Sequence, residues 1–288
     1  MKLFRRIILV VVVLLCGAIG YFAWTVQTKD LPEGTLVSAS NIKVLPTSYG
    51  YLVDPIPETA LTGMVFLAGA FIGADAYVPF ARSLAAAGHP VRVIGLESGV
   101  AQLPGQQARL NGTISSLMSG ERAWVIGGHS LGSAYAAMFA AANESQIKGL
   151  FMVGTGNPYT DLSALSVPVT ILGATNDNVA NGRNDDDRAK NLPPRLTMSQ
   201  IEGGNHAQFG YYGPQIMDGT ASLSRQAQQA QMTDAALNLL DRIDNRSAVA
   251  ERNDFTTMPR QRAVRYATQF AVPARLQGLM PQAFRQES

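Results

Sequence analysis

The chain has 288 residues, which is enough for one α/β domain with additional segments at its ends. Its hydrophobic fraction of 47% excludes intrinsic disorder, and its net charge of +2 provides no electrostatic case for nucleic acid. One cysteine excludes an internal disulfide and a cysteine-cluster metal site, and three histidines argue against a His-rich metal centre. We therefore expect neither a metal nor a nucleic-acid partner.

An uninterrupted apolar segment, residues 7–26, follows a basic flank at residues 1–6. A helix of this length rises about 30 Å, the thickness of the hydrocarbon core of a bilayer. A cleavable signal peptide has a shorter apolar core and ends in small residues, whereas this segment ends in Tyr21-Phe22-Ala23-Trp24. We expect an uncleaved, single-pass cell-membrane anchor with the N-terminus in the cytoplasm and the chain beyond it extracytoplasmic. Cleavage, or lipidation of Cys16, is the alternative.

After a polar spacer at residues 27–34, a domain at residues 35–244 alternates short apolar runs with helical patterns. Runs of Val, Ile, Leu and Met are typical of parallel strands that are buried on both faces. The alternation predicts a doubly wound, mostly parallel α/β sheet. The expected strands are Leu36–Ser38, Ile42–Leu45, Tyr49–Val53, Met64–Leu67, Val91–Leu96, Ala123–Ile126, Leu150–Val153, Val169–Leu172 and Leu196–Ile201. The expected helices are Tyr77–Ala87, Gln107–Met118, Leu131–Ala142 and Gln226–Ile243.

The composition changes near Asn245, and the tail at residues 245–288 carries seven Arg against three acidic residues. We favour a partly ordered extension that docks on the core or has no role. A basic segment that lies on anionic lipid near the anchor is the alternative.

A strand, a tight turn and a helix meet in the sequence Gly128-His129-Ser130-Leu131-Gly132, which matches the G-x-S-x-G nucleophile elbow. Such a turn exposes the serine hydroxyl at the carboxyl edge of the sheet. The glycines remove Cβ atoms where strand and helix nearly touch, and the helix N-terminus attracts a developing anion. We interpret Ser130 as a nucleophile. An ordinary serine in a Gly-rich turn is the alternative.

A serine nucleophile needs a base. His89 precedes Pro90 at the start of a strand, at the wrong edge of the sheet, and His129 lies inside the elbow. His206 follows the last strand in a Gly-rich loop at the carboxyl edge, so His206 is the expected base.

The histidine in turn needs an acid that orients it. Asp177 lies in the loop after the penultimate strand, again at the carboxyl edge, and is the expected acid. The rival acids are Asp185, Asp186 and Asp187 in a charged run, and Asp161 and Glu97.

The developing oxyanion needs two N–H donors. Leu131 follows the nucleophile and should supply one. The loop after Met64–Leu67 should supply the other, from Ala70 or from its neighbour Phe71.

These motifs resemble the α/β-hydrolase superfamily, and more narrowly its small bacterial dienelactone-hydrolase-like branch, over residues 48–242. The resemblance implies Ser130 as nucleophile, His206 as base and Asp177 as acid. The sequence departs from the family pattern at Ala68-Gly69-Ala70 and at Ser133. The segments that carry the resemblance are Val53-Asp54-Pro55, Leu67–Ala70, Tyr77 with Leu84–Gly88, Gly128–Gly132, and the histidine loop Gly203–Gly213.

Only a short segment, Gly154–Pro168, separates two strands at the place where cap insertions are common in lipases and epoxide hydrolases. We therefore expect an open site without a cap domain, suited to small or short-acyl esters. The prediction is a membrane-anchored serine hydrolase, a carboxylesterase that works through an acyl-enzyme without a cofactor. An acyltransferase or thioesterase would use the same residues. A non-catalytic interaction protein that keeps the fold is a further alternative.

Overall fold

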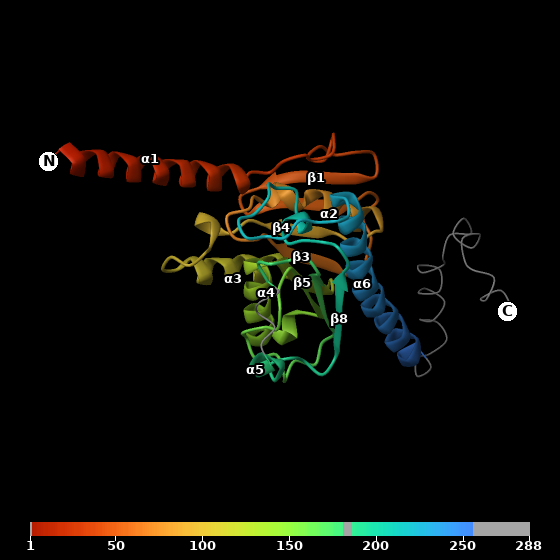
Figure 1. The fold of residues 1–288 in the computed structure, drawn as a ribbon. Coiled ribbons are helices and arrows are strands. Elements are labelled where there is room, and N and C mark those ends of the chain that lie inside the picture. Colours follow the sequence, from red (N-terminus) through yellow and green to blue (C-terminus); the bar gives the residue numbers. More distant parts are fainter. Residues whose placement is uncertain (1, 181–185, 256–288) are drawn as a thin grey trace. The chain divides into compact units, whose positions relative to one another are not determined.

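The computed structural model describes residues 2–180 and 186–255 (Figure 1). The first compact unit spans Met1–Asp244, and Asn245–Ser288 form the second. Within the expected tail only residues 245–255 are described, as a helical continuation, so the expectations for the rest of the tail lie outside the described residues.

An eight-stranded sheet forms the centre of the first unit, in the order β1-β2-β4-β3-β5-β6-β7-β8. β2 runs antiparallel to both of its neighbours, and all other pairs are parallel. This confirms the expected doubly wound, mostly parallel sheet. The strands are β1 Ile42–Thr47, β2 Gly50–Pro55, β3 Gly63–Leu67, β4 Val91–Ile94, β5 Trp124–His129, β6 Gly149–Val153, β7 Val169–Ala174 and β8 Leu196–Ile201.

Helices cover both faces of this sheet (Figure 1). One hydrophobic core lies under α2 and α6, and a second lies under α3 and α4. The helices are α1 Lys2–Thr25, α2 Val78–Ala86, α3 Gln106–Leu117, α4 Leu131–Ala142, α5 Asp186–Ala189 and α6 Arg225–Phe255. Short 3₁₀ turns are Ala74–Tyr77, Glu97–Gly99, Glu144–Gln146 and Ala207–Phe209.

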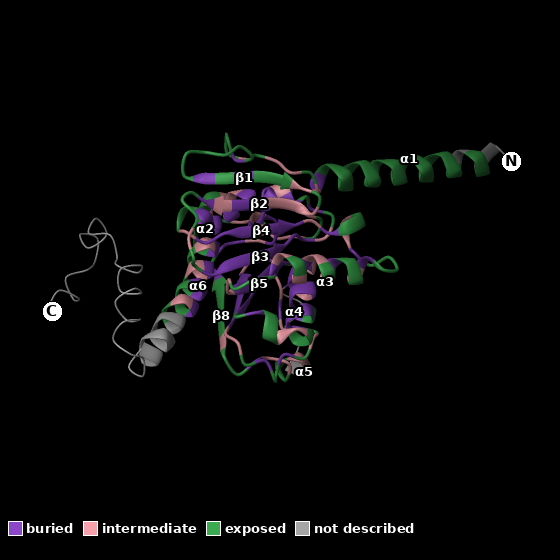
Figure 2. Cartoon of the chain, turned by 180° about the vertical axis from the view of Figure 1, so that it is seen from behind, coloured by how far each residue is buried: buried purple, intermediate pink, exposed green. Residues whose placement is uncertain are grey.

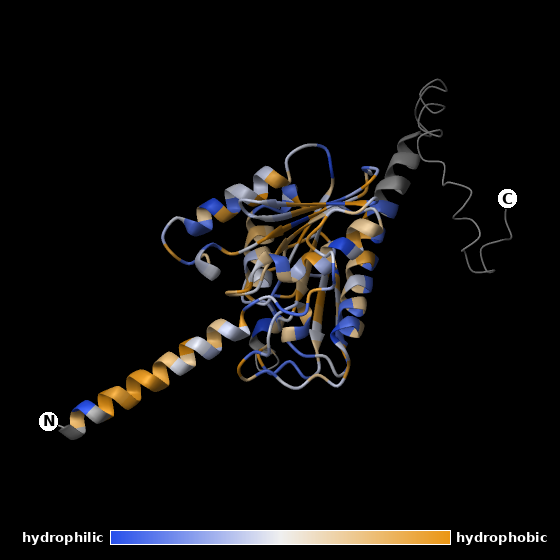
Figure 3. Ribbon diagram, turned by 90° about the horizontal axis from the view of Figure 1, so that it is seen from above, coloured by the Kyte–Doolittle hydropathy of each residue, from blue (hydrophilic) through white to orange (hydrophobic). Residues whose placement is uncertain are grey.

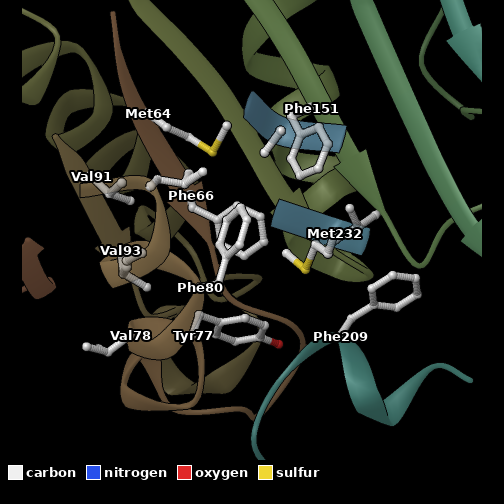
Figure 4. Close-up of a cluster of buried hydrophobic side chains, with 14 of the residues drawn as sticks. Met64, Phe66, Tyr77, Val78, Phe80, Val91, Val93, Phe151, Phe209 and Met232 are labelled. Carbon is white, nitrogen blue, oxygen red and sulfur yellow. The ribbon is translucent and has the colours of Figure 1, made fainter. Parts of the chain in front are cut away.

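The central strands β3, β5, β6 and β7 are buried along their whole length (Figure 2). Their near-continuous apolar sequences follow from this, because each strand packs against a helical layer on both faces. Aromatic rings fill the core beside α2, where Phe66 contacts both Tyr77 and Phe80 (Figure 4). A close-packed core therefore holds the carboxyl edge of the sheet, from which the loops after β3, β5, β7 and β8 leave.

Several element boundaries differ from those expected. Leu36 and Val37 form a turn and a bend rather than a strand, and the Ser38 hydroxyl exchanges hydrogen bonds with the backbone of Val44. β5 continues to His129 through two glycines, which pair with Phe151 and Met152 of β6. The last helix continues to Phe255, beyond the expected end at residue 243.

α1 contains the apolar stretch Ile7–Thr25, the one segment in the described part of the chain that is long and apolar enough to cross a membrane. Its side chains are exposed along nearly the whole helix, and its surface is apolar (Figures 2 and 3). Length and composition make α1 a candidate membrane span, and a signal sequence would share both features.

Candidate active site

Ser130 lies on a strained turn between the end of β5 and the start of α4. Its φ of 54° and ψ of −117° are unusual for a residue with a side chain. A Cβ on Gly128 would lie 2.4 Å from the carbonyl carbon of Gly132, and a Cβ on Gly132 would lie 2.3 Å from the carbonyl oxygen of Leu67. Both glycines of the motif are thus required by backbone contact, one inside the elbow and one against β3.

Ser133, where the sequence departs from the family pattern, is buried and fully hydrogen-bonded. Its hydroxyl accepts the Val153 N–H at 3.0 Å and lies within donor range of the carbonyls of Val153 and Gly128. The side chain therefore ties the elbow to β6, and the departure adds a contact at this position.

Asp177 and His206 lie together at the carboxyl edge, as expected from their loops. His206 Nδ1 is 2.8 Å from Asp177 Oδ2, and both residues are only 1% exposed. The other carboxylate oxygen accepts the N–H groups of Val179 and Ala180 at 2.9 and 2.7 Å. The Asp177 side chain is thereby locked by its own turn, with one oxygen left for the histidine.

Two of the rival acids bind other groups. Glu97 forms an exposed ion pair with Arg109, and Asp161 caps the N–H of Ser163. Of the acidic run, Asp185 lies outside the described residues, and Asp186 and Asp187 begin α5.

His89 is buried at the opposite, amino edge of the sheet, where its Nδ1 donates to the carbonyl of Thr62. This placement agrees with its rejection as a base.

Asp218 supports the histidine loop and was not singled out from the sequence. Its carboxylate accepts the backbone N–H of His206 at 3.1 Å and that of Ala207 at 2.8 Å. Burial raises the pKa of Asp218, and these two hydrogen bonds oppose the rise. An acidic residue in a long loop has no distinctive sequence signal, so only the folded loop identifies this support.

A second buried chain of hydrogen bonds links the loop after β3 to the elbow. The Gly69 N–H donates to the Tyr77 hydroxyl at 3.1 Å, and that hydroxyl lies 2.8 Å from His129 Nδ1. The His129 ring packs on the His206 ring, with centroids 4.5 Å apart. Desolvation lowers the pKa of His129 well below its usual value, and the nearby His206 lowers it further. His129 is therefore a neutral structural member of the site.

The two expected oxyanion donors follow β3 and β5, which are neighbours in the sheet. The Phe71 N–H donates to the carbonyl of Gly99 at 2.7 Å and is thus already used. The N–H groups of Ala70 and Leu131 have no hydrogen-bond acceptor within residues 2–180 and 186–255. This distinction favours Ala70 over Phe71. The strand order reverses between β3 and β5, the position where α/β sheets open a ligand crevice.

In the part of the chain that the structure describes, no three His, Cys, Asp or Glu side chains gather as a set of metal ligands. The carboxyl edge carries Ser130 after β5, Asp177 after β7 and His206 after β8, and the 2.8 Å contact between Asp177 and His206 brings two of the three together. This is an arrangement that supports nucleophilic chemistry.

The family model of the α/β hydrolase family matches residues 63–230, more than half of the chain. The chain therefore belongs to the α/β hydrolase family, and its described residues contain no lid domain. A search of the curated proteins finds no match.

Among solved structures, Est1E from Butyrivibrio proteoclasticus is similar at 12% identity and a TM-score of 0.49. The match covers 70% of this chain and 100% of Est1E. XC6422 from Xanthomonas campestris, described as an α/β serine hydrolase without lid, is similar at 16% identity and a TM-score of 0.46. That match covers 70% of this chain and 97% of XC6422.

Proposed function

We propose that this protein is a membrane-anchored serine hydrolase, a carboxylesterase in which Ser130, His206 and Asp177 act as a catalytic triad. The observation that carries the proposal is the buried 2.8 Å contact between Asp177 and His206 at the edge where the strained elbow holds Ser130. The membership of the chain in the α/β hydrolase family supports the same class of reaction.

In this proposal the contact to Asp177 leaves Nε2 of His206 as the nitrogen that serves Ser130. As the serine Oγ attacks the carbonyl carbon of the ester, Nε2 takes its proton. The oxygen that becomes negative is held by the N–H groups of Leu131 and Ala70, at the N-terminus of α4 and after β3.

Collapse of this intermediate breaks the bond between the carbonyl carbon and the leaving alcohol. The imidazolium returns its proton to that alcohol, and an acyl-enzyme forms on Ser130. Water, deprotonated by His206, then attacks the acyl group, and the acid is released with regeneration of the serine hydroxyl. These residues suffice for both half-reactions without a cofactor.

The substrate class follows from what surrounds the site. The segment between β6 and β7, residues 154–168, contains no inserted helix or strand. A site without a cap has few walls for a long acyl chain, which favours small or short-acyl esters.

The direct test is labelling of the full-length protein with a fluorophosphonate, a reagent that reports an activated serine without requiring the substrate. We expect Ser130→Ala to abolish labelling and His206→Ala to slow it by roughly a hundredfold or more, because general-base assistance is lost. Ser83→Ala, on an exposed position of α2, is the matched control and should label like the wild type.

Folded wild-type protein that takes no label would refute the proposal and favour a non-catalytic interaction protein. Where labelling succeeds, a panel of esters and thioesters defines the leaving group. Product analysis with an added alcohol then separates hydrolysis from acyl transfer.

A further inference from the structure

The end of α1 and the residues after it are hydrogen-bonded to the hydrolase domain. The Gly213 N–H donates to the Thr25 carbonyl at 2.9 Å, and the Lys29 N–H donates to the Tyr211 carbonyl at 2.8 Å. The Thr28 hydroxyl donates to Asp75 at 2.8 Å. The end of α1 is thus attached to the domain at one point, and the first part of the expected spacer is attached at two.

The loops that hold this segment are the loops of the candidate active site. Tyr211 and Gly213 belong to the histidine loop, and Asp75 lies in the connection between β3 and α2 that also carries Ala70. The Phe22 ring of α1 meets the Phe71 ring edge-on, with centroids 5.3 Å apart. α1 therefore leaves the domain from the carboxyl edge of the sheet, the edge that also holds Ser130 and His206 (Figure 1).

The same edge carries exposed apolar side chains, which we call the apolar rim: Phe71, Leu103, Ile216 and Met217. Leu103 is 58% exposed on the connection between β4 and α3, and Met217 is 81% exposed next to Asp218. The rim residues thus flank the loop of Ala70 on one side and the loop of His206 on the other.

The last turn of α1 has the composition of a membrane–water interface. Tyr21, Phe22 and Trp24 lie there, and the ammonium group of Lys29 lies 3.0 Å from the centroid of the Trp24 ring. Aromatic rings and a lysine at the end of an apolar span are typical of the level of the lipid headgroups. Because this turn is hydrogen-bonded to the site loops, the headgroup level and the apolar rim lie at the same edge of the domain.

We infer that the apolar rim rests on the bilayer that holds α1, and that the substrate is an amphiphilic ester residing in that bilayer. This inference rests on the proposed function and narrows its substrate class. The ester group of such an amphiphile lies at the membrane surface, where it reaches Ser130 through the open carboxyl edge. A short acyl group on a membrane-held alcohol also fits a site that lacks a cap.

Docking is tested first by a measurement that needs no catalysis. In a full-length Cys16→Ser background, an environment-sensitive dye is attached at Leu103→Cys or at Val37→Cys. Val37 is 65% exposed and precedes β1 at the amino edge, so it is the matched control. In vesicles of phosphatidylcholine and phosphatidylglycerol with brominated chains, the dye at 103 should lose most of its fluorescence and the dye at 37 should keep it. Equal quenching at both positions, or none at 103, overturns the docking.

The substrate class is tested with two acetate esters, a soluble nitrophenyl ester and a long-chain alcohol ester held in the same vesicles. Leu103→Asp and Met217→Asp should lower turnover of the vesicle ester by about tenfold, since a charge replaces an apolar contact at the interface. Turnover of the soluble ester should stay unchanged, and Val37→Asp should affect neither ester.

Equal losses on both esters in Leu103→Asp and Met217→Asp overturn the membrane-held substrate. If the wild type hydrolyses neither ester and takes no fluorophosphonate, the proposed function fails. The quenching experiment then still decides the docking by itself.

Discussion

His129 shows at the scale of one residue how the site is held together. It is 1% exposed, its Nδ1 faces the Tyr77 hydroxyl, and its ring packs on that of His206. Because the Tyr77 oxygen accepts the Gly69 N–H, the phenol proton is best placed toward Nδ1, which puts the histidine proton on Nε2. Burial removes water from the ring, and the nearby His206 disfavours a second positive charge, so both lower the pKa of His129.

The lowered pKa of His129 predicts a pH-dependent stability. The folded state binds this proton only at a lower pH than the unfolded state, whose histidine titrates near 6.5. Stability is therefore fully present above pH 6.5. It falls as the pH drops below that value, by up to about 1.4 kcal/mol per pH unit. His129→Gln removes this proton, so its free energy of unfolding in detergent should fall less steeply from pH 7 to pH 5.5.

The comparison is made between the two slopes in urea titrations of the full-length protein. Asp218, whose raised pKa acts in the opposite sense on acidification, is present in both proteins and cancels. Identical slopes of unfolding free energy against pH for wild type and His129→Gln would contradict the lowered pKa of His129 as the cause of the pH dependence.

The elbow is the point where the elements β5, α4 and β3 meet in backbone contact, and their packing there sets the position of Ser130. A Cβ on Gly132 would lie 2.3 Å from the Leu67 oxygen and 2.5 Å from the Ala68 oxygen. These are backbone atoms of the strand and loop that position Ala70. The elbow and the oxyanion loop are thus packed as one unit, and a shift in either moves the other.

Gly132→Ala should therefore destabilise the protein by about 2–3 kcal/mol and slow fluorophosphonate labelling. Gly112→Ala is the matched control, because an added Cβ on this exposed glycine of α3 meets nothing within 4 Å. That change should stabilise the protein by about 0.5–1 kcal/mol through the helix preference of alanine. Thermal unfolding of both variants in detergent measures the two effects. If Gly132→Ala is as stable as Gly112→Ala, the elbow can accommodate a Cβ at position 132, and the predicted steric clash with β3 is wrong.

The whole molecule combines a candidate membrane helix with a hydrolase domain, and the junction between them is structured. Thr25, the last residue of α1, is 3% exposed, and a Cβ on Gly213 would lie 2.9 Å from its carbonyl oxygen. A signal peptide is normally followed by an accessible cleavage site with small residues. The bulky residues Tyr21, Phe22 and Trp24 at the end of α1 do not match such a site.

We accordingly expect the protein purified from membranes to retain α1. Its intact mass should correspond to a chain that still contains residues 7–26, and it should stay with the membrane after an alkaline wash. A mature N-terminus beyond residue 26, found by mass spectrometry, would support the signal-peptide reading instead.

Much of the fold could be predicted from the sequence because its signals are local. Buried parallel strands read as apolar runs, and eight of the nine expected strands are present. Leu36–Ser38 is absent as a strand, and Leu36 and Val37 form a turn and a bend instead. Gly127 and Gly128 near the end of β5 have low strand propensity, so the length of that strand follows only from its pairing with β6.

The identity and order of the candidate triad residues could be predicted from the chain alone, because the elbow motif and the position of each loop after a strand are local properties. The groups that support these residues are identified only in the folded chain. Asp218, Tyr77 and Ser133 act across loops and strands that the chain pattern does not connect. The hydrogen bond from the Phe71 N–H to the Gly99 carbonyl and the attachment of α1 to the histidine loop also join segments that the chain pattern does not connect. These contacts form between segments that are far apart in the chain. A hydrogen bond between two such segments leaves no periodic pattern in the sequence, so sequence analysis does not find it.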